Sequence, residues 1–336
     1  MQQLVPKDVA APSEGRLSNR SHTDDFAVVI GIDDYPSFRP LKGAVADATA
    51  FRDWLCDPAG GGLRPEHVKF VTSTPTPTPE QKHIDQVIEE LIVTADRNEG
   101  GRRLYFYFSG HGAAATDAMA NVALLLADWS KKRARLGLSS QSYANDLASY
   151  GLFEELAVFL DCCRTESTPI VGLACTLTPT VTTAKTVTRN FVAYAAEFGQ
   201  SAFERPDGEL WQGVFTRCLL QILKRSGGGV TAGELKDLLE REVTATHGRQ
   251  KAHVENSLLG SSRFGIHGEW PRLEITFSPY TIGPVRLFDG FQQLVGDHDP
   301  AAGRWTLQLK SGLYKLVDSS ERKRVVDFPA ESVIEF

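Results

Sequence analysis

The chain has 336 residues, 42% apolar and 23% charged, which are the proportions of an ordinary soluble protein with one large and one small domain. Its formal net charge of −6 and the lack of a basic stripe with interleaved aromatic residues argue against a nucleic-acid partner. The apolar runs near the predicted sheet are only about strand length, well short of the roughly 20 residues of a membrane-spanning helix, and the N-terminus has no secretion signal, so we expect a cytoplasmic protein without a membrane partner.

After a flexible polar leader over residues 1–24, apolar runs and amphipathic stretches alternate along much of the chain. A run of apolar, aromatic or β-branched residues predicts a buried parallel strand, whereas an apolar period near 3.6 residues predicts a helix packed on a sheet. We therefore expect strands at 26–32, 68–71, 104–108, 122–126, 156–160 and 191–195, and helices at 41–57, 80–96, 140–150, 213–223 and 230–246. Because strands separated by helices imply right-handed crossovers, the fold class is α/β with a mostly parallel sheet.

Two later stretches break this pattern. Residues 164–190 are rich in Thr, Ser and Pro and predict a long exposed connection. After about residue 268, apolar and polar residues alternate in short segments separated by Gly, Pro and Asp-Gly turns. These segments lie at 273–277, 285–288, 305–309, 314–317, 325–328 and 333–336. This pattern is typical of a small antiparallel β-sandwich or barrel, so a β-rich, sandwich-like domain with a binding or structural role is predicted over residues 268–336.

Two of the predicted strands end in reactive side chains. The segment YFYFSGHG (105–112) brings His111 to the end of one strand, and LAVFLDCCR (156–164) brings Cys162 and Cys163 to the end of another. Open α/β sheets place their ligand chemistry just past the carboxyl ends of the strands. A thiol becomes a strong nucleophile when a nearby imidazole takes its proton. The two segments therefore predict covalent catalysis.

The five cysteines form no CxxC pair and no metal-ligand spacing, and their odd number argues against a disulfide framework. We expect Cys56, Cys175 and Cys218 to be small core residues of a protein in a reducing compartment. Neighbouring residues of a strand point to opposite faces, so only one of Cys162 and Cys163 can face His111.

The chain resembles the caspase-like cysteine peptidases, in particular the metacaspase and bacterial caspase-homologue branch. The matching segments, in the family's order, are FAVVIGIDDYPSFRPLKGAVADA (26–48), RLYFYFSGHG (103–112), LAVFLDCCRTES (156–167), FVAYAAEFGQSAFE (191–204) and GVFTRCLLQIL (213–223). The resemblance implies a caspase-like sheet sandwiched by helices over residues 25–267. It divides this domain into a large-subunit-like part (25–165), a linker (166–190) and a small-subunit-like part (191–267).

The resemblance also implies catalytic roles. Cys163, two residues after Asp161, would be the nucleophile, and Cys162 would pack inward. His111 would act as general base and then as general acid toward the departing amine. The backbone N–H groups of Gly112 and Cys163 would form the oxyanion hole. The other seven histidines are expected at the surface.

Specificity follows from the same resemblance. True caspases cut after aspartate, whereas metacaspases cut after arginine or lysine by means of acidic groups. Asp47, Ser109 and Asp161 occupy positions that resemble the metacaspase pocket for the P1 side chain. Two carboxylates can bind a guanidinium bidentately, so we expect protein substrates with Arg or Lys at P1. Otherwise Asp47 would be a solvated helix residue and Asp161 a strand-end cap.

The chain departs from the metacaspase pattern at Ala44, where a cysteine is often found. Relatives bind activating calcium through clustered aspartates, but here Asp128 is followed by a basic run that includes Lys131, Lys132, Arg133 and Arg135. Such a run suits Ca²⁺ poorly, because the ion takes several oxygen ligands. We therefore expect no metal and no cofactor, and calcium activation is disfavoured.

Lys185 and Arg189 lie in the connection where caspases are cut between their subunits, and both fit the inferred specificity. Cleavage there would make the chain a zymogen, and the alternative is an uncut loop. The expected function is a regulated peptidase in stress, defence or cell death, with an activating protease or regulator bound through the β-rich domain. There are two alternatives. One is a caspase-fold pseudoenzyme or scaffold that acts through the β-rich domain, and the other is a Cys–His hydrolase of small molecules.

Overall fold

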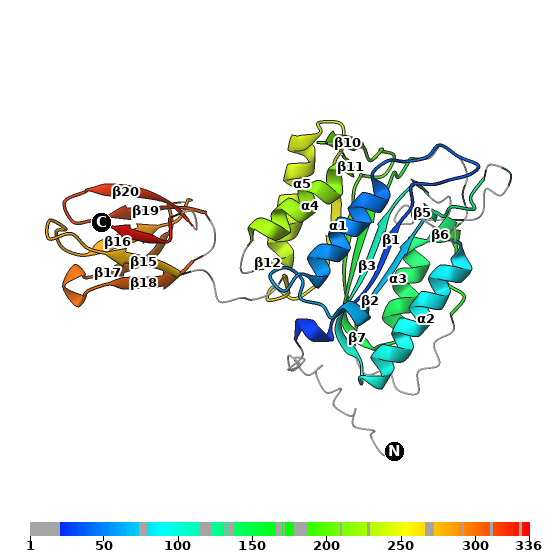
Figure 1. Cartoon of the computed structure of the whole chain (residues 1–336), viewed down its shortest axis with the longest axis horizontal. Helices are drawn as coiled ribbons and strands as arrows, with labels where there is room; N and C mark the ends of the chain where they lie inside the picture. Colours follow the sequence, from blue (N-terminus) through cyan, green and yellow to red (C-terminus); the bar gives the residue numbers. More distant parts are fainter. Residues whose placement is uncertain are drawn as a thin grey trace, which may run out of the picture.

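The computed structural model describes residues 21–336 except 74–78, 115–121, 131, 133–136, 166–169, 171, 178–186, 209, 227–228, 266–271, 291, 310–311 and 329–330. Its elements form an α/β unit and, from Arg272 onward, a set of β-strands (Figure 1). No helix in the described part of the chain is long and apolar enough to cross a membrane.

A six-stranded sheet forms the centre of the α/β unit, in the order β13-β9-β7-β3-β1-β2. Its strands are β1 (Phe26–Gly31), β2 (Val68–Thr72), β3 (Gly101–Ser109), β7 (Phe153–Asp161), β9 (Arg189–Tyr194) and β13 (His253–Asn256). All neighbours pair in parallel except the edge strand β13, which runs antiparallel to β9. The longest apolar runs of the sequence become the central strands β1, β3 and β7, since both faces of these strands are covered.

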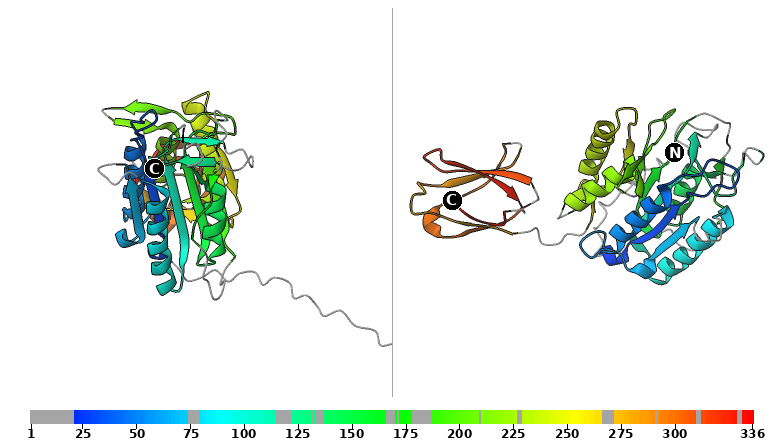
Figure 2. Two further views of the ribbon diagram at one scale, coloured as in Figure 1. Left: turned by 90° about the vertical axis from the view of Figure 1, so that its right-hand side faces the viewer. Right: turned by 45° about the horizontal axis from the view of Figure 1, so that its top comes forward.

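Helices cover the sheet on both faces, as Figures 1 and 2 show. One face carries α1 (Ala44–Cys56), α4 (Val214–Arg225) and α5 (Ala232–Thr246), and the other carries α2 (Gln81–Arg97) and α3 (Ser140–Ser149). Phe51, Leu219 and Leu235 belong to the apolar core of the first face, and Ile88 and Leu147 to that of the second. The predicted helices are thus present, and the predicted α/β fold with a mostly parallel sheet is confirmed.

Several short elements were not predicted. The strand expected at 122–126 joins a separate small sheet rather than the central one. That sheet consists of β4 (Gly112–Ala114), β5 (Val122–Leu125), β6 (Gly137–Ser139) and β8 (Gly172–Leu173), in this order. Two further pairs are β10 (Glu204–Asp207) with β11 (Leu210–Gly213), and β12 (Val230–Thr231) with β14 (Arg263–Phe264). Short 3₁₀ turns lie at His22–Asp24, inside the predicted leader, at Pro65–His67 and at Pro300–Ala302.

The exposed connection predicted over residues 164–190 is partly buried. Ile170 is in the core, and Cys175 and Leu177 pack against the same apolar cluster. The Thr- and Ser-rich composition concealed these anchors, because single apolar residues in a polar stretch give no periodic signal.

The C-terminal strands form two sheets around their own apolar cluster, which includes Leu273, Leu287, Leu316 and Phe328. The sheets have the orders β18-β15-β21 and β17-β16-β19-β20. Their strands are β15 (Arg272–Thr276), β16 (Val285–Phe288), β17 (Leu294–His298), β18 (Trp305–Gln308), β19 (Gly312–Val317), β20 (Lys323–Phe328) and β21 (Val333–Glu335). The prediction of a purely antiparallel arrangement was wrong in one pair, since β15 and β21 run parallel. Strand β17 was not predicted.

Strand register brings the chemistry of the α/β unit to one edge. Gly31 of β1 lies beside Ser109 of β3, and Ser109 lies beside Asp161 of β7. Since the three strands are parallel neighbours and end together, the segments that follow them emerge side by side.

Candidate active site

A small pocket of about 50 Å³ lies at this carboxyl edge of the sheet. Asp47, Ser109, His111, Asp161 and Cys163 all line it. The structure therefore places the predicted nucleophile, the predicted base and the three predicted P1-binding side chains around one cavity.

His111 is held by the loop that follows β1. Its backbone N–H donates to the hydroxyl of Tyr35 at 2.8 Å, and that hydroxyl donates to the carbonyl of Leu125 at 3.1 Å. The rings of Tyr35 and Phe38 each lie 4.7 Å from the imidazole, centroid to centroid. Two aromatic rings thus pack against the imidazole, and a hydrogen bond holds the backbone of the same residue.

The hydrogen bonds of His111 define its tautomer. Nε2 lies 2.7 Å from the carbonyl oxygen of Arg39, and a carbonyl only accepts, so Nε2 carries the proton. Nδ1 is then the basic nitrogen. Burial lowers the pKa of His111, and this effect outweighs the opposing bond to the Arg39 carbonyl. The imidazole is therefore neutral at physiological pH and able to accept a proton.

The two adjacent cysteines differ in surroundings. Cys162 is buried in the apolar core beneath α2 and α3, whereas Cys163 is half-buried. The Cys163 thiol donates to the carbonyl of Ala202 at 3.6 Å, and burial raises its pKa. In this conformation Cys163, the predicted nucleophile, is a neutral thiol. Of the other three cysteines, Cys218 is buried as expected, but Cys56 and Cys175 are only half-buried.

Gly112 lies directly against the cysteine segment. A Cβ at this position would come within 2.6 Å of Cys162 Sγ and 2.8 Å of the Cys163 carbonyl oxygen. Only glycine permits this approach of the two backbones. The oxyanion hole formed by the N–H groups of Gly112 and Cys163 stays a prediction.

The two aspartates of the pocket are buried acids that bind the start of α4. Oδ2 of Asp47 accepts from the N–H of Gly213 at 2.9 Å and from the hydroxyl of Ser109 at 3.3 Å. Oδ2 of Asp161 accepts from the N–H and the hydroxyl of Thr216 at 3.0 and 2.7 Å. Both acids thus have the cap-like bonds of a structural role, but each uses only one oxygen in these bonds.

The second carboxylate oxygen of one of these aspartates lacks a hydrogen-bond partner among the described residues. Oδ1 of Asp47 is buried and has no hydrogen-bond partner in the described part of the chain. Burial, and then the charge of Asp161, raise the pKa of Asp47 well above its usual range. Burial also raises the pKa of Asp161, to about 6, against the hydrogen bonds from Thr216. A cation that enters the pocket would satisfy both acids.

Gly213 separates the two carboxylates. A Cβ there would overlap an oxygen of Asp161 and come within 2.8 Å of Oδ2 of Asp47. The backbone therefore passes between the acids where no side chain fits. The sequence analysis did not identify this residue as part of the site.

Glu204 is a third acid that the sequence analysis missed. It lines the pocket, and its Oε1 accepts from the N–H of Gly43 at 2.9 Å, just before α1. Its charge raises the pKa of both Asp47 and Asp161. The only sequence signal was its place at the end of the fourth matching segment. Arg39, whose carbonyl orients His111, gave no signal, because a backbone group does not depend on residue type.

The remaining predicted residues lie elsewhere. Arg189 is the first residue of β9, paired with β7, and Lys185 lies outside the described residues, as do Lys131, Arg133 and Arg135. Within the described ranges, no three His, Cys, Asp or Glu side chains are placed to hold a metal ion. The expectation that all other histidines are at the surface was wrong for His67, which is buried and stacks on Phe26 at 4.0 Å.

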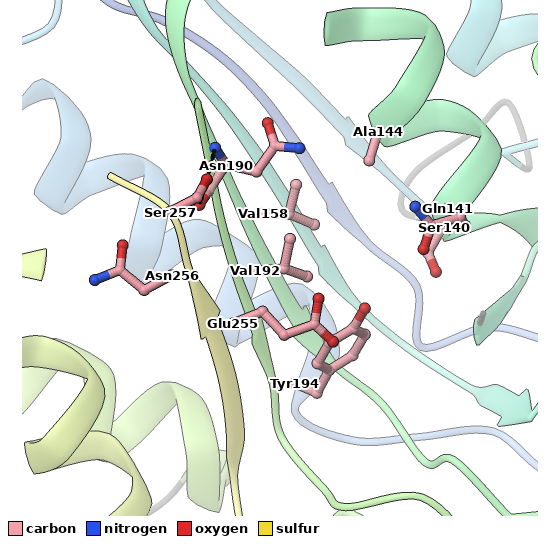
Figure 3. A pocket seen from close by; sticks show the side chains of 10 residues that line it. All are labelled: Ser140, Gln141, Ala144, Val158, Asn190, Val192, Tyr194, Glu255, Asn256 and Ser257. Carbon is pink, nitrogen blue, oxygen red and sulfur yellow. Dashed lines mark hydrogen bonds between the residues drawn. The ribbon is translucent and has the colours of Figure 1, made fainter. Parts of the chain in front are cut away.

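A second, larger pocket of about 310 Å³ lies away from the predicted dyad (Figure 3). Val158 and Val192 line it from the sheet, α3 contributes Ala144, and Glu255 and Tyr194 lie beside each other (Figure 3). None of the predicted site residues lines this pocket.

Comparison with known proteins identifies the α/β unit. The family described as the caspase domain matches residues 24–261. A probable protease of a Desulfuromonadales bacterium is 31% identical over 220 residues, which are 60% of this chain and 26% of that protein. The chain thus spans about a quarter of the length of this curated relative.

Two solved structures are similar to this chain at low sequence identity. Caspase-1 from Spodoptera frugiperda superposes with a TM-score of 0.50 and 13% identity, over 80% of this chain and 98% of that one. Protein GSU0716 from Geobacter sulfurreducens has a TM-score of 0.47 and 14% identity, over 69% of this chain and 92% of that one.

Proposed function

The chain belongs to the caspase-domain peptidase family, and on that premise we propose that it is a cysteine endopeptidase that cleaves proteins after arginine or lysine. The observation that carries this proposal is the pocket lined by Cys163, His111 and two buried aspartates that have no ion-pair partner among the described residues. Because this chain covers only about a quarter of its curated relative, the proposal concerns the activity of this chain and not that of the longer protein.

In the proposed reaction, Nδ1 of His111 takes the thiol proton of Cys163, and the thiolate attacks the carbonyl carbon of the scissile bond. The tetrahedral intermediate collapses to a thioester as His111 returns the proton to the leaving amine. A water molecule, deprotonated by His111, then hydrolyses the thioester and restores the thiol. The N–H groups of Gly112 and Cys163 would stabilise the oxyanion.

The acids of the pocket support a basic P1 residue. Asp47 and Asp161 are buried, and no ion pair within 4.0 Å joins either of them to a cation among the described residues. An uncompensated buried carboxylate is costly, and a guanidinium or ammonium group removes that cost. An aspartate at P1 would instead add a further negative charge beside Glu204.

The described conformation fits a resting enzyme. A volume of about 50 Å³ is far below the roughly 300–1,000 Å³ of typical ligand sites, so a long P1 side chain has to displace part of the wall. The Cys163 thiol is bound to the Ala202 carbonyl rather than poised as a thiolate. We propose that substrate, a regulator or cleavage between the subunit-like parts opens this wall.

Peptide substrates with Arg, Lys or Asp at P1 and a fluorogenic leaving group test the proposal. Wild type is expected to cleave after Arg and Lys, Cys163→Ala to be inactive, and Cys162→Ala to remain active as the matched control. Cleavage after Asp alone would contradict the acidic pocket. A wild type inactive under all conditions, including after proteolytic nicking and with added calcium, would favour the scaffold that acts through its β-rich domain.

Self-processing needs a separate test. Intact-mass analysis of wild type and of Cys163→Ala would reveal a cut near Lys185 or Arg189 that disappears in the variant. Cleavage at Arg189 is the less favourable of the two, because this residue is paired in β9 and a protease binds an extended, unpaired segment.

A further inference from the structure

Thr216, in the first turn of α4, lies behind the acidic pocket and does not line it. It is fully buried, with 0% of its surface exposed. Its N–H and its hydroxyl both donate to one oxygen of Asp161, Oδ2, at 3.0 and 2.7 Å. On the far side, the hydroxyl of Tyr107 in β3 lies 2.6 Å from the same Thr216 oxygen.

The chemistry of these groups fixes the direction of the chain of bonds. A threonine hydroxyl has one hydrogen, and here that hydrogen goes to the Asp161 carboxylate. Tyr107 must then donate to Thr216. The chain runs from Tyr107 through Thr216 to the carboxylate, and each bond in such a chain polarises and strengthens the next.

These bonds leave one oxygen of Asp161 available. Oδ2 takes both donors from Thr216, so the carboxylate cannot rotate about its own axis without breaking two charge-assisted bonds. The bonds also oppose burial in setting the pKa of Asp161. Thr216 therefore affects both the orientation and the ionisation of this acid.

We propose that Thr216 is a positioning residue for the P1 side chain: its hydroxyl, backed by Tyr107, holds the Asp161 carboxylate so that its second oxygen meets the P1 cation. The inference rests on the proposed function, because it assumes that Asp161 binds a P1 arginine or lysine. It adds a residue that sequence position alone would assign to the buried side of a helix.

A purely structural role is the competing explanation. Asp161 accepts the N–H of Thr216 and so caps α4 from outside the helix. In that case loss of the hydroxyl would lower stability and would affect all reactions of Cys163 to the same extent. A role in P1 recognition would instead affect only reagents that carry a basic P1 group.

Two alkylating reagents separate these explanations. Iodoacetamide and a peptidyl chloromethyl ketone with P1 Arg both form a bond from carbon to the Cys163 sulfur, with loss of iodide or chloride and of the thiol proton. Only the second reagent uses the pocket. The same ketone with P1 Ala gives the basal rate of a peptidyl reagent.

For Thr216→Val, which keeps the volume but removes the hydroxyl, we expect the P1-Arg rate to fall at least tenfold. The acidic limb of the pH–rate profile for the P1-Arg reagent should move to higher pH, because the Asp161 carboxylate loses a hydrogen-bond donor. The iodoacetamide and P1-Ala rates should change less than twofold.

Thr216→Ser should restore the P1-Arg rate, and Tyr107→Phe should lower it about threefold. Thr244→Val, which removes a hydroxyl bonded to a backbone carbonyl in α5, is the control and should change nothing.

An unchanged P1-Arg rate in Thr216→Val, or an equal fall with all three reagents, would overturn the inference. If Thr216→Val fails to fold, Tyr107→Phe decides, since a wild-type P1-Arg rate in that variant counts against the chain of bonds. A wild type that does not prefer the P1-Arg reagent over P1-Ala would instead overturn the proposed specificity itself. If wild type prefers the P1-Arg reagent and only Asp161→Asn loses this preference, the proposed function stands but Thr216 has no part in it.

Discussion

The two ends of the central sheet both bury charged side chains, but they differ in how the charges are compensated. At the amino ends of the strands, Arg102 pairs with Asp25 and Arg103 with Glu155, each at 2.5 Å. At the carboxyl ends, Asp47 and Asp161 are equally buried, and among the described residues neither has a cation within ion-pair distance.

The pKa of Glu155 follows this difference, whereas burial outweighs the Arg102 guanidinium and raises the pKa of Asp25. Burial tends to raise the pKa of Glu155, but the Arg103 guanidinium and the hydrogen bonds outweigh burial and lower it. Burial also raises the pKa of Asp47 and Asp161, where hydrogen bonds oppose it but no cation among the described residues does. The amino end is therefore built for stability, whereas the carboxyl end keeps two acids in an unfavourable state that a bound cation would relieve.

The largest expected effect concerns the amino end. Glu155→Ala would leave the fully buried Arg103 without its carboxylate, and loss of one partner of a buried pair costs about 3–5 kcal/mol. We expect a fall in melting temperature of roughly 10 °C, measured by calorimetry. Activity per folded molecule should be unchanged at low temperature. A fall in melting temperature of less than 2 °C would contradict the stabilising role of this pair.

The second prediction tests the gap between the two acids. Gly213→Ala would push a methyl group into both carboxylates, so we expect kcat/KM for P1-Arg substrates to fall about 100-fold. Gly233→Ala is the matched control, because a Cβ there meets nothing within 4 Å. Wild-type kinetics in Gly213→Ala would show that the pocket lies elsewhere.

The third prediction concerns pH. A P1 cation needs an ionised acid, and the pKa of Asp161 is about 6, so kcat/KM for Arg substrates should rise with pH through this value. At pH 5 it should be about tenfold below its plateau. The pKa of His111 is lowered by burial, so its own limb lies at more acidic pH than for an ordinary histidine. Asp161→Asn should remove the limb near 6, and an unchanged profile in that variant would assign the limb to another group.

The smallest expected effect is a gain in stability. Because the folded-state pKa of Asp47 is raised, its contribution to stability is present below the unfolded value and is lost as pH rises through the folded value. Asp47→Asn should therefore raise the melting temperature at pH 8 by a few degrees, about 1–2 kcal/mol, and change it little near pH 4.5. An equal shift at both pH values would mean that charge is not the cause. Thermal scans at the two pH values measure this difference, and a parallel loss of P1-Arg turnover would link it to function.

Much of the fold was predictable because it follows from local patterns. The runs that end in His111 and Cys163 are apolar enough to be buried on both faces, and parallel neighbours bring their ends together. The antiparallel edge strand β13 and the hairpin of β10 and β11 were not predicted, since they are short and partly exposed and carry little apolar signal.

The sequence by itself determined the strand ends, the candidate thiol and imidazole, and the family resemblance, since these depend on residue type within short segments. Only the tertiary structure decided how Gly213, Thr216 and Glu204 meet Asp47 and Asp161, and which nitrogen of His111 is basic. These features arise from backbone groups and buried side chains far apart in the chain. Their effect depends on distance and burial, which no local pattern encodes.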